Sequence, residues 1–138
     1  MPDTLLILFM SMLFFLFLAY LPIYFWRTEK KLTILNFVDG RHNIPEKGLK
    51  AKIATLAFEN YKETYPIFLT LCTLGITMGI PLQHASLMWL LSRFIHAPSY
   101  IFNWKWIRTL SWHLSLLCLM TMIFQIIFLN RLTMFTHF

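Results

Sequence analysis

Charged side chains are scarce in this 138-residue chain. Asp, Glu, Lys and Arg make up only 13% of the sequence, whereas a soluble domain carries about a quarter. Hydrophobic residues make up 58%, and the mean hydropathy is +0.62. This composition excludes an ordinary soluble domain. It predicts an integral membrane protein, with too few residues for a second domain.

Cysteine and acidic residues are also rare, and each shortage excludes a class of protein. The two cysteines, Cys72 and Cys118, lie in apolar runs without a CxxC spacing, so we expect packing residues and no disulfide framework. The shortage of acidic residues leaves a net charge of +6. No arginine-rich arm or aromatic-basic RNA motif accompanies it, so we expect no nucleic-acid partner. We also expect no bound metal.

Four long apolar segments dominate the chain. They cover about residues 5–26, 50–78, 82–103 and 107–129. In a helix that rises 1.5 Å per residue, about 20 residues cross the hydrocarbon core of a bilayer. Short connections separate the last three segments, which favours antiparallel neighbours. The sequence therefore predicts one all-α domain over residues 1–138, an up-down bundle of four transmembrane helices.

The first apolar segment has two interpretations, a cleaved signal peptide or a retained membrane anchor. Its leader carries Asp3 and no Lys or Arg, and the apolar run is longer than that of a signal peptide. We therefore interpret it as a retained helix.

Lys and Arg residues gather in two of the connections, and Trp104, Trp106 and Trp112 follow the pattern of an interfacial aromatic belt. Cytoplasmic connections carry more Lys and Arg than the opposite side of a membrane. We therefore expect loops one and three to be cytoplasmic and both termini to be outside or lumenal. Loop one holds Arg27, Lys30, Lys31, Arg41, Lys47, Lys50 and Lys52, the third connection adds Lys105 and Arg108, and the opposite side offers Arg131 alone.

Two polar residues, Asn60 and Glu63, lie three positions apart in the second apolar segment. Ala57, Asn60 and Glu63 would share one face of a helix, and Pro66 follows in the same row. An amide and a carboxylate near hydrocarbon are costly unless they have partners. This face therefore requires a basic or hydrogen-bonding counterpart elsewhere in the chain.

The third apolar segment supplies that counterpart. Arg93, His96 and Tyr100 are spaced as i, i+3 and i+7, on one face of a helix, and Arg108 opens the next segment. Glu63 and Arg93 have two interpretations, a buried ion pair that fixes helix register or a pair of ligand-binding groups. His96 is more typical of a hydrogen-bonded core histidine than of a catalytic base.

Together these residues form a pattern that resembles a known family. The pattern is Ala57-x-x-Asn60-x-x-Glu63-x-x-Pro66-x-Phe68, then Arg93-x-x-His96-x-x-x-Tyr100, then Arg108. It resembles the MAPEG family, the membrane-associated proteins of eicosanoid and glutathione metabolism, over about residues 45–130. The resemblance implies a four-helix membrane protein that forms a homotrimer and binds glutathione between subunits, on the cytoplasmic side.

The resemblance also implies a role for each matching position. Asn60 and Glu63 would contact the peptide and amino parts of glutathione, and Arg93 would bind a carboxylate or pair with Glu63. Tyr100 would hold the ligand near its cysteine, with His96 in the same set. Arg108 would be the catalytic residue that stabilises the thiolate, the reactive nucleophile. The implied function is a glutathione transferase or peroxidase acting on hydrophobic electrophiles.

Two alternatives remain open at this stage. Leu56 occupies a position where glutathione-using members usually place an arginine. This departure favours a non-catalytic membrane protein of the same fold, which binds lipid or serves as an accessory subunit of a larger membrane complex. Separately, His96 and His113 would both lie roughly 10 Å inside the membrane, a depth compatible with a bis-histidine haem. Nothing else in the sequence indicates a haem pocket.

Overall fold

The computed structural model describes the backbone of residues 2–31 and 45–135 and the side chains of residues 3–31 and 45–131. The described residues form helices and no strand, which confirms the all-α prediction. The helices are α1 (Pro2–Lys30), α3 (Leu49–Met78), α4 (Gln83–Ile101) and α5 (Lys105–Phe135). Each expected apolar segment lies mainly within one of these helices.

Two of the helices are long and apolar enough to cross a membrane on their own sequence. These are the stretches Asp3–Lys30 and Lys105–Arg131, which contain 18-residue windows with mean hydropathies of 2.5 and 2.0. The other two helices, α3 and α4, carry the polar residues of the expected site. Helices α1 and α5 therefore give the clearest evidence of membrane spans, and α3 and α4 carry most of the polar residues of the expected site.

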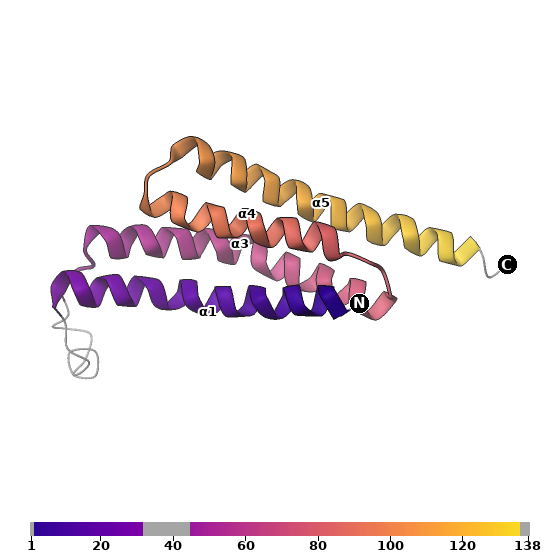
Figure 1. Cartoon of the computed structure of the whole chain (residues 1–138), viewed down its shortest axis with the longest axis horizontal. Coiled ribbons are helices and arrows are strands. Elements are labelled where there is room, and N and C mark those ends of the chain that lie inside the picture. The colour runs from indigo at the N-terminus through magenta and orange to yellow at the C-terminus, as the bar shows by residue number, and fades with distance from the viewer. Residues whose placement is uncertain (1, 32–44, 136–138) are drawn as a thin grey trace.

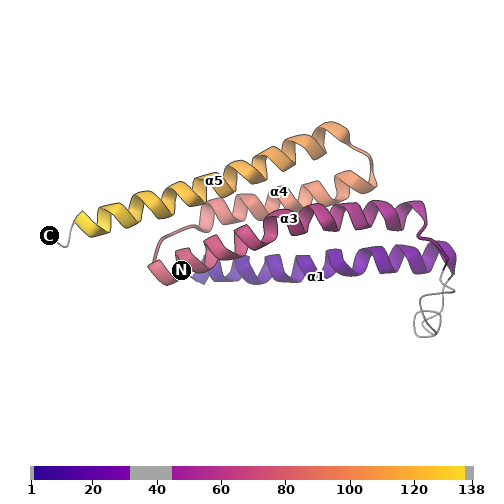
Figure 2. The same cartoon turned by 180° about the vertical axis from the view of Figure 1, so that it is seen from behind.

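The helices lie roughly alongside one another, with α3 and α4 between α1 and α5 (Figures 1 and 2). The most extensive packing joins α4 to α5 and α1 to α3. The end of α1, the start of α3 and the connection between α4 and α5 lie at one end (Figure 1). The start of α1, the turn between α3 and α4, and the end of α5 lie toward the other. The described basic residues of loop one and of the third connection therefore share one end of the molecule.

The turns that follow α3 and α4 use the same capping geometry. Gly79 has a φ of 71°, and the Ile80 N–H donates to the Gly75 carbonyl at 2.8 Å. Asn103 has a φ of 56°, and the Trp104 N–H donates to the Ser99 carbonyl at 3.0 Å. Glycine and asparagine tolerate this left-handed backbone, which closes a helix by a six-residue hydrogen bond. Both turns are therefore short.

The ends of α1 and α3 are tied together by side chains. The Glu29 carboxylate accepts hydrogen bonds from the backbone N–H groups of Lys50 at 3.0 Å and Ala51 at 3.2 Å. A carboxylate is favourable at a helix N-terminus because the first N–H groups lack partners within the helix. The Trp26 indole also donates to the Pro45 carbonyl at 3.0 Å. Arg41, counted in loop one, lies outside the described residues.

Trp89 of α4 lies at the centre of the aromatic core. Its ring stacks on Phe68 of α3 with centroids 3.8 Å apart, and it also contacts Tyr61. The Tyr61 hydroxyl donates to the Ser11 carbonyl of α1 at 3.2 Å. These contacts fix α4 against α3 and α1. They therefore place Arg93, one turn after Trp89, against the polar part of α3.

Candidate functional site

Arg93 is buried between α4 and α3 and is held by neutral groups. Its side chain is 1% exposed. Nη1 donates to the Asn60 Oδ1 at 3.0 Å, and Nη2 donates to the Thr64 Oγ1 at 2.7 Å. The guanidinium also lies 5.7 Å from the centre of the Trp89 ring. Arg93 is therefore the hydrogen-bonding counterpart that the sequence predicted for Asn60. Thr64 is a second acceptor for the same guanidinium.

Glu63 is not part of this arrangement. Its side chain is exposed, and no ion pair with Arg93 occurs among the described residues. The interpretation of the two as a buried ion pair is therefore wrong. The reason is helical geometry, because three residues advance about 300°, so each step of three rotates about 60° away from a given face. The buried face of α3 instead includes Ala57, Tyr61 and Thr64.

His96 joins α4 to the first turns of α5. Its side chain is 3% exposed, and Nδ1 lies 3.0 Å from the Arg108 carbonyl and 3.1 Å from the Ser111 Oγ. Because a carbonyl only accepts, Nδ1 carries the proton, and the neutral ring keeps a lone pair on Nε2. Nε2 is buried without a hydrogen-bond partner in the described part of the chain. The prediction of a hydrogen-bonded core histidine is confirmed.

A polar cavity opens where α3, α4 and α5 meet. Its volume is about 340 Å³. The cavity includes four of the six predicted site residues, while Arg93 reaches its edge through the bond to Asn60. Glu63 does not line it. The lining residues are Asn60, His96, Tyr100, Arg108, Thr109, Trp112 and His113.

The electrostatics of the cavity favour an anion. Arg108 lines it and lies with its guanidinium carbon 4.9 Å from the centre of the Tyr100 ring. The lining contains no carboxylate. His113 directs Nδ1 to the Thr109 carbonyl at 2.8 Å, so its Nε2 is also a hydrogen-bond acceptor when the ring is neutral. A ligand with a carboxylate or thiolate and with hydrogen-bond donors would match these groups.

Three cavity residues were not identified from the sequence. Thr109, Trp112 and His113 follow Arg108 on one face of α5, at one, four and five positions beyond it. Extending the helix face from Arg108 would have found them. Trp112 was instead interpreted as an interfacial residue, because tryptophan is common both in membrane interfaces and in ligand sites.

Comparison with protein families gives a match over most of the chain. The model of the MAPEG family matches residues 4–128. The chain belongs to the MAPEG family. No curated protein and no solved structure matches the chain. Membership of the MAPEG family, together with the two apolar helices, identifies a membrane protein of that family.

His96 and His113 both line the cavity of this MAPEG protein. Each directs Nδ1 toward a backbone carbonyl, Arg108 for the first and Thr109 for the second. Within residues 2–31 and 45–135, no three or more His, Cys, Asp and Glu side chains form a group that could hold a metal ion. Both rings are hydrogen-bonded to α5 through Nδ1.

Proposed function

We propose that the chain is a multi-pass membrane protein, with four transmembrane helices in an up-down bundle, and that it forms a homotrimer. Family membership and the apolar helices α1 and α5 support the membrane location. The described basic residues at the end of α1 and at the starts of α3 and α5 share one end of the molecule (Figure 1). By the excess of Lys and Arg on cytoplasmic loops, this end is cytoplasmic, and both termini are outside or lumenal.

We propose that the polar cavity binds glutathione. The observation that carries the proposal is the convergence of Asn60, His96, Tyr100 and Arg108 on one cavity. These residues come from three helices and are up to 48 positions apart (108 − 60). Glutathione has two carboxylates, an ammonium and amide groups. Its carboxylates and amides suit a lining with one arginine, one amide and two hydroxyls and without a carboxylate.

In the proposed reaction Arg108 stabilises the glutathione thiolate. The thiol loses its proton to water, and the guanidinium offsets the negative charge that develops on sulfur. The sulfur then attacks an electrophilic carbon of an apolar substrate. A carbon–sulfur bond forms, and the bond from that carbon to its leaving group breaks with both electrons going to the leaving group. Asn60 and Tyr100 orient the tripeptide, and Nε2 of His96 accepts a hydrogen bond from it.

In the proposed homotrimer, the exposed Glu63 would belong to the binding site of a neighbouring subunit. The carboxylate lies on α3 outside the cavity of its own subunit. A neighbouring subunit packed on this face would bring Glu63 toward the glutathione bound there, where it would pair with the ammonium. This arrangement would also give a partner to an acidic residue that forms no ion pair among the described residues.

Thiolate formation tests the enzymatic proposal directly. The purified protein in detergent is mixed with glutathione, and the ultraviolet absorbance of the thiolate is recorded. We expect absorbance with the wild type and its loss in Arg108→Ala, together with a fall of about 10²–10³ in the rate of conjugation to a model electrophile. Arg131→Ala, which removes a cation outside the cavity, is the matched control. Absence of thiolate in the wild type at millimolar glutathione would refute the enzyme proposal.

A second candidate function is a non-catalytic membrane subunit that binds lipid or belongs to a larger membrane complex. Leu56 is exposed on α3 at the position where the family resemblance leads us to expect an arginine, and Glu63 lies outside the cavity. Both observations favour this candidate. Affinity purification from native membranes separates the two, because the second predicts a partner protein in fixed ratio and no glutathione binding.

A further inference from the structure

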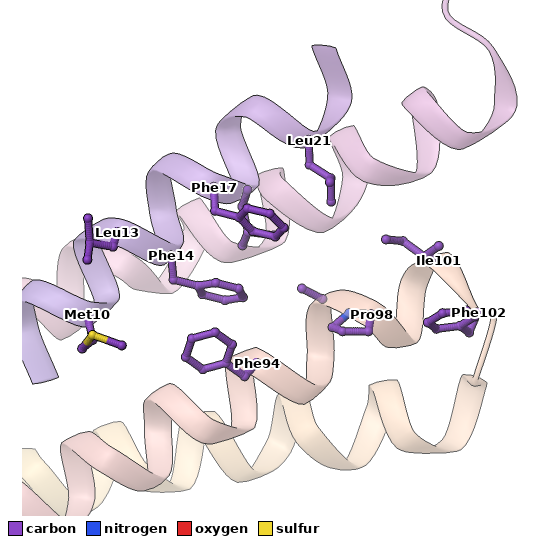
Figure 3. Close-up of a pocket in the computed structure, with 11 residues that line it drawn as sticks. Met10, Leu13, Phe14, Phe17, Leu21, Phe94, Pro98, Ile101 and Phe102 are labelled. Carbon is purple, nitrogen blue, oxygen red and sulfur yellow. The ribbon is translucent and has the colours of Figure 1, made fainter. Parts of the chain in front are cut away.

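An apolar groove lies between α1 and α4, on the side of α4 that faces away from the polar cavity. It has a volume of about 550 Å³. None of its eleven lining side chains is polar (Figure 3). An engineered apolar cavity of about 150 Å³ stays free of water and takes up benzene. A groove this large in a membrane protein therefore requires an apolar occupant.

The length of the groove matches one leaflet of a bilayer. On α1 its lining runs from Met10 to Leu21, a rise of roughly 16 Å. The hydrocarbon core of a bilayer is about 30 Å thick, so one leaflet is about half of that. The rings of Phe14 and Phe94 meet across the two helices, with centroids 4.1 Å apart. Leu18 is 1% exposed and completes the floor, which leaves a long, shallow channel.

Basic residues follow the helices beyond one end of this channel: Lys31 comes ten positions after Leu21 (31 − 21), and Lys105 three positions after Phe102 (105 − 102). Leu21 of α1 and Phe102 after α4 lie at that end (Figure 3). Lys31 follows the end of α1, and Lys105 begins α5, so both lie at the same end of the molecule (Figure 1). Both side chains are exposed. A lysine near a membrane surface attracts anionic lipid headgroups.

We propose that the groove holds one acyl chain of an anionic phospholipid, whose phosphate group lies near Lys31 and Lys105. This inference rests on the proposed membrane location and does not depend on glutathione. A second copy of the chain fits the groove less well. A second copy in the same orientation would present its own Lys and Arg residues at this end and no anionic group. A phospholipid supplies the opposite charge there.

The first arm of the test fills the groove. Protein delipidated in detergent is titrated with palmitoyl-oleoyl phosphatidylglycerol, and native mass spectrometry counts bound lipid per subunit. Ala97 is 6% exposed and lines the channel, so Ala97→Phe should occupy the channel. We expect its dissociation constant for the lipid to rise at least about tenfold, the loss when roughly two methylene groups leave an apolar surface.

Controls separate blockage from misfolding. Ile101→Trp fills the rim of the channel at a half-buried position and should act in the same direction. Leu117→Trp adds similar bulk on an exposed face of α5 outside the channel and should leave lipid binding unchanged. Elution volume and helical circular dichroism confirm that each variant is folded. Lipid binding that is equal in folded Ala97→Phe, Ile101→Trp and the wild type would overturn the proposal.

The second arm tests the headgroup. The wild type should prefer phosphatidylglycerol to phosphatidylcholine with the same chains, and Lys31→Gln and Lys105→Gln should each reduce that preference by roughly fivefold. Arg131→Gln at the far end of α5 should leave it unchanged. Equal binding of the two lipids by the wild type would overturn the anionic assignment. Disulfide cross-linking between copies carrying Leu21→Cys would show that a second copy fills the channel and would overturn the proposal as a whole.

Discussion

The two sides of α4 present opposite chemistry within a single helix. Toward α3 and α5, Arg93, His96 and Tyr100 carry hydrogen-bonding groups, and His96 and Tyr100 border a polar cavity. Toward α1, Phe94 and Ile101 border a groove with no polar side chain. The two surfaces are formed by residues that are neighbours in the sequence, because successive side chains are about 100° apart around a helix.

The polar side of α4 is fixed against α3 by directional hydrogen bonds, whereas the apolar side leaves an open groove against α1. Each guanidinium nitrogen of Arg93 that donates to α3 has one specific acceptor, Asn60 or Thr64. The groove side depends on less directional packing, in which dispersion and apolar contact tolerate different occupants. Substitutions on the first side should therefore disrupt the fold, and those on the second should change what binds. The comparison can be tested on adjacent residues.

Arg93→Ala should cause the largest loss of stability. It leaves Asn60 and Thr64 without their donor and creates a space beside Trp89. Interhelical hydrogen bonds in membranes contribute about 0.6–1.7 kcal/mol each, and the space adds to the loss. We expect a decrease of about 2–4 kcal/mol in the free energy of unfolding, measured by denaturant titration in mixed micelles. Arg131→Ala is the control, and an equal effect of both would contradict the assigned role.

Two substitutions at His96 separate the roles of its two ring nitrogens. Nδ1 bonds to the Arg108 carbonyl, and Nε2 has no hydrogen-bond partner among the described residues. In His96→Asn the side-chain amide can still donate to the Arg108 carbonyl, but nothing replaces Nε2. His96→Gln places its amide farther out, near the position of Nε2, and loses that bond. We expect His96→Asn to be more stable by about 1 kcal/mol and to bind glutathione more weakly. Thermal unfolding and ligand titration measure the two effects, and the reverse order in stability would show that Nδ1 is not the structural contact.

Phe94→Ala should cost less than the truncation of a buried phenylalanine. Phe94 is 40% exposed to the groove, so its removal widens a space that an acyl chain can fill. A buried Phe→Ala substitution costs about 3–5 kcal/mol, and we expect about 1 kcal/mol here by the same denaturant titration. A loss as large as that of Arg93→Ala would remove the distinction between the two sides of α4.

Glu63→Gln should have the smallest effect on stability. The side chain is exposed and has no ion pair among the described residues, so a change below about 0.5 kcal/mol is expected. Its effect on binding should be larger, because loss of a charged hydrogen bond to the glutathione ammonium would raise the dissociation constant about tenfold. Isothermal titration measures this. Unchanged affinity would exclude Glu63 from the site, even in a trimer.

The sequence predicted the polar side of α4 better than it predicted the partner face on α3. Arg93 and His96 are rare polar residues in an apolar helix, so their spacing alone identifies a shared face. On α3 both Glu63 and Thr64 lie within about 60° of Asn60. The prediction chose the charged residue, whereas the structure places the neutral Thr64 against Arg93. The spacing of residues within α3 does not decide which of Glu63 and Thr64 faces Arg93. The rotation of α3 about its own axis decides it, and the stacking of Phe68 on Trp89 helps to set that rotation.

The groove was not predicted, and the reason is the membrane itself. In a soluble protein, polar residues mark the exposed face of a helix and apolar residues mark its core. In hydrocarbon both faces are apolar, so Phe17, which is exposed on the groove, and Phe14, which is buried, look alike in the sequence. No residue type in a sequence marks an unfilled volume between two helices. Such a volume depends on how the helices are placed, and their placement depends on contacts between residues distant in the chain.

The hydrogen bonds from the first N–H groups of α3 to the Glu29 carboxylate join α1 to α3 through residues outside the segment that connects them. We therefore expect an insertion in that segment to leave these bonds in place. An epitope tag spliced between residues 32 and 44 should leave the bundle assembled, with Trp26 still bound to Pro45. Antibody access to that tag in sealed and in permeabilised membrane vesicles would then reveal which compartment this end of the molecule faces.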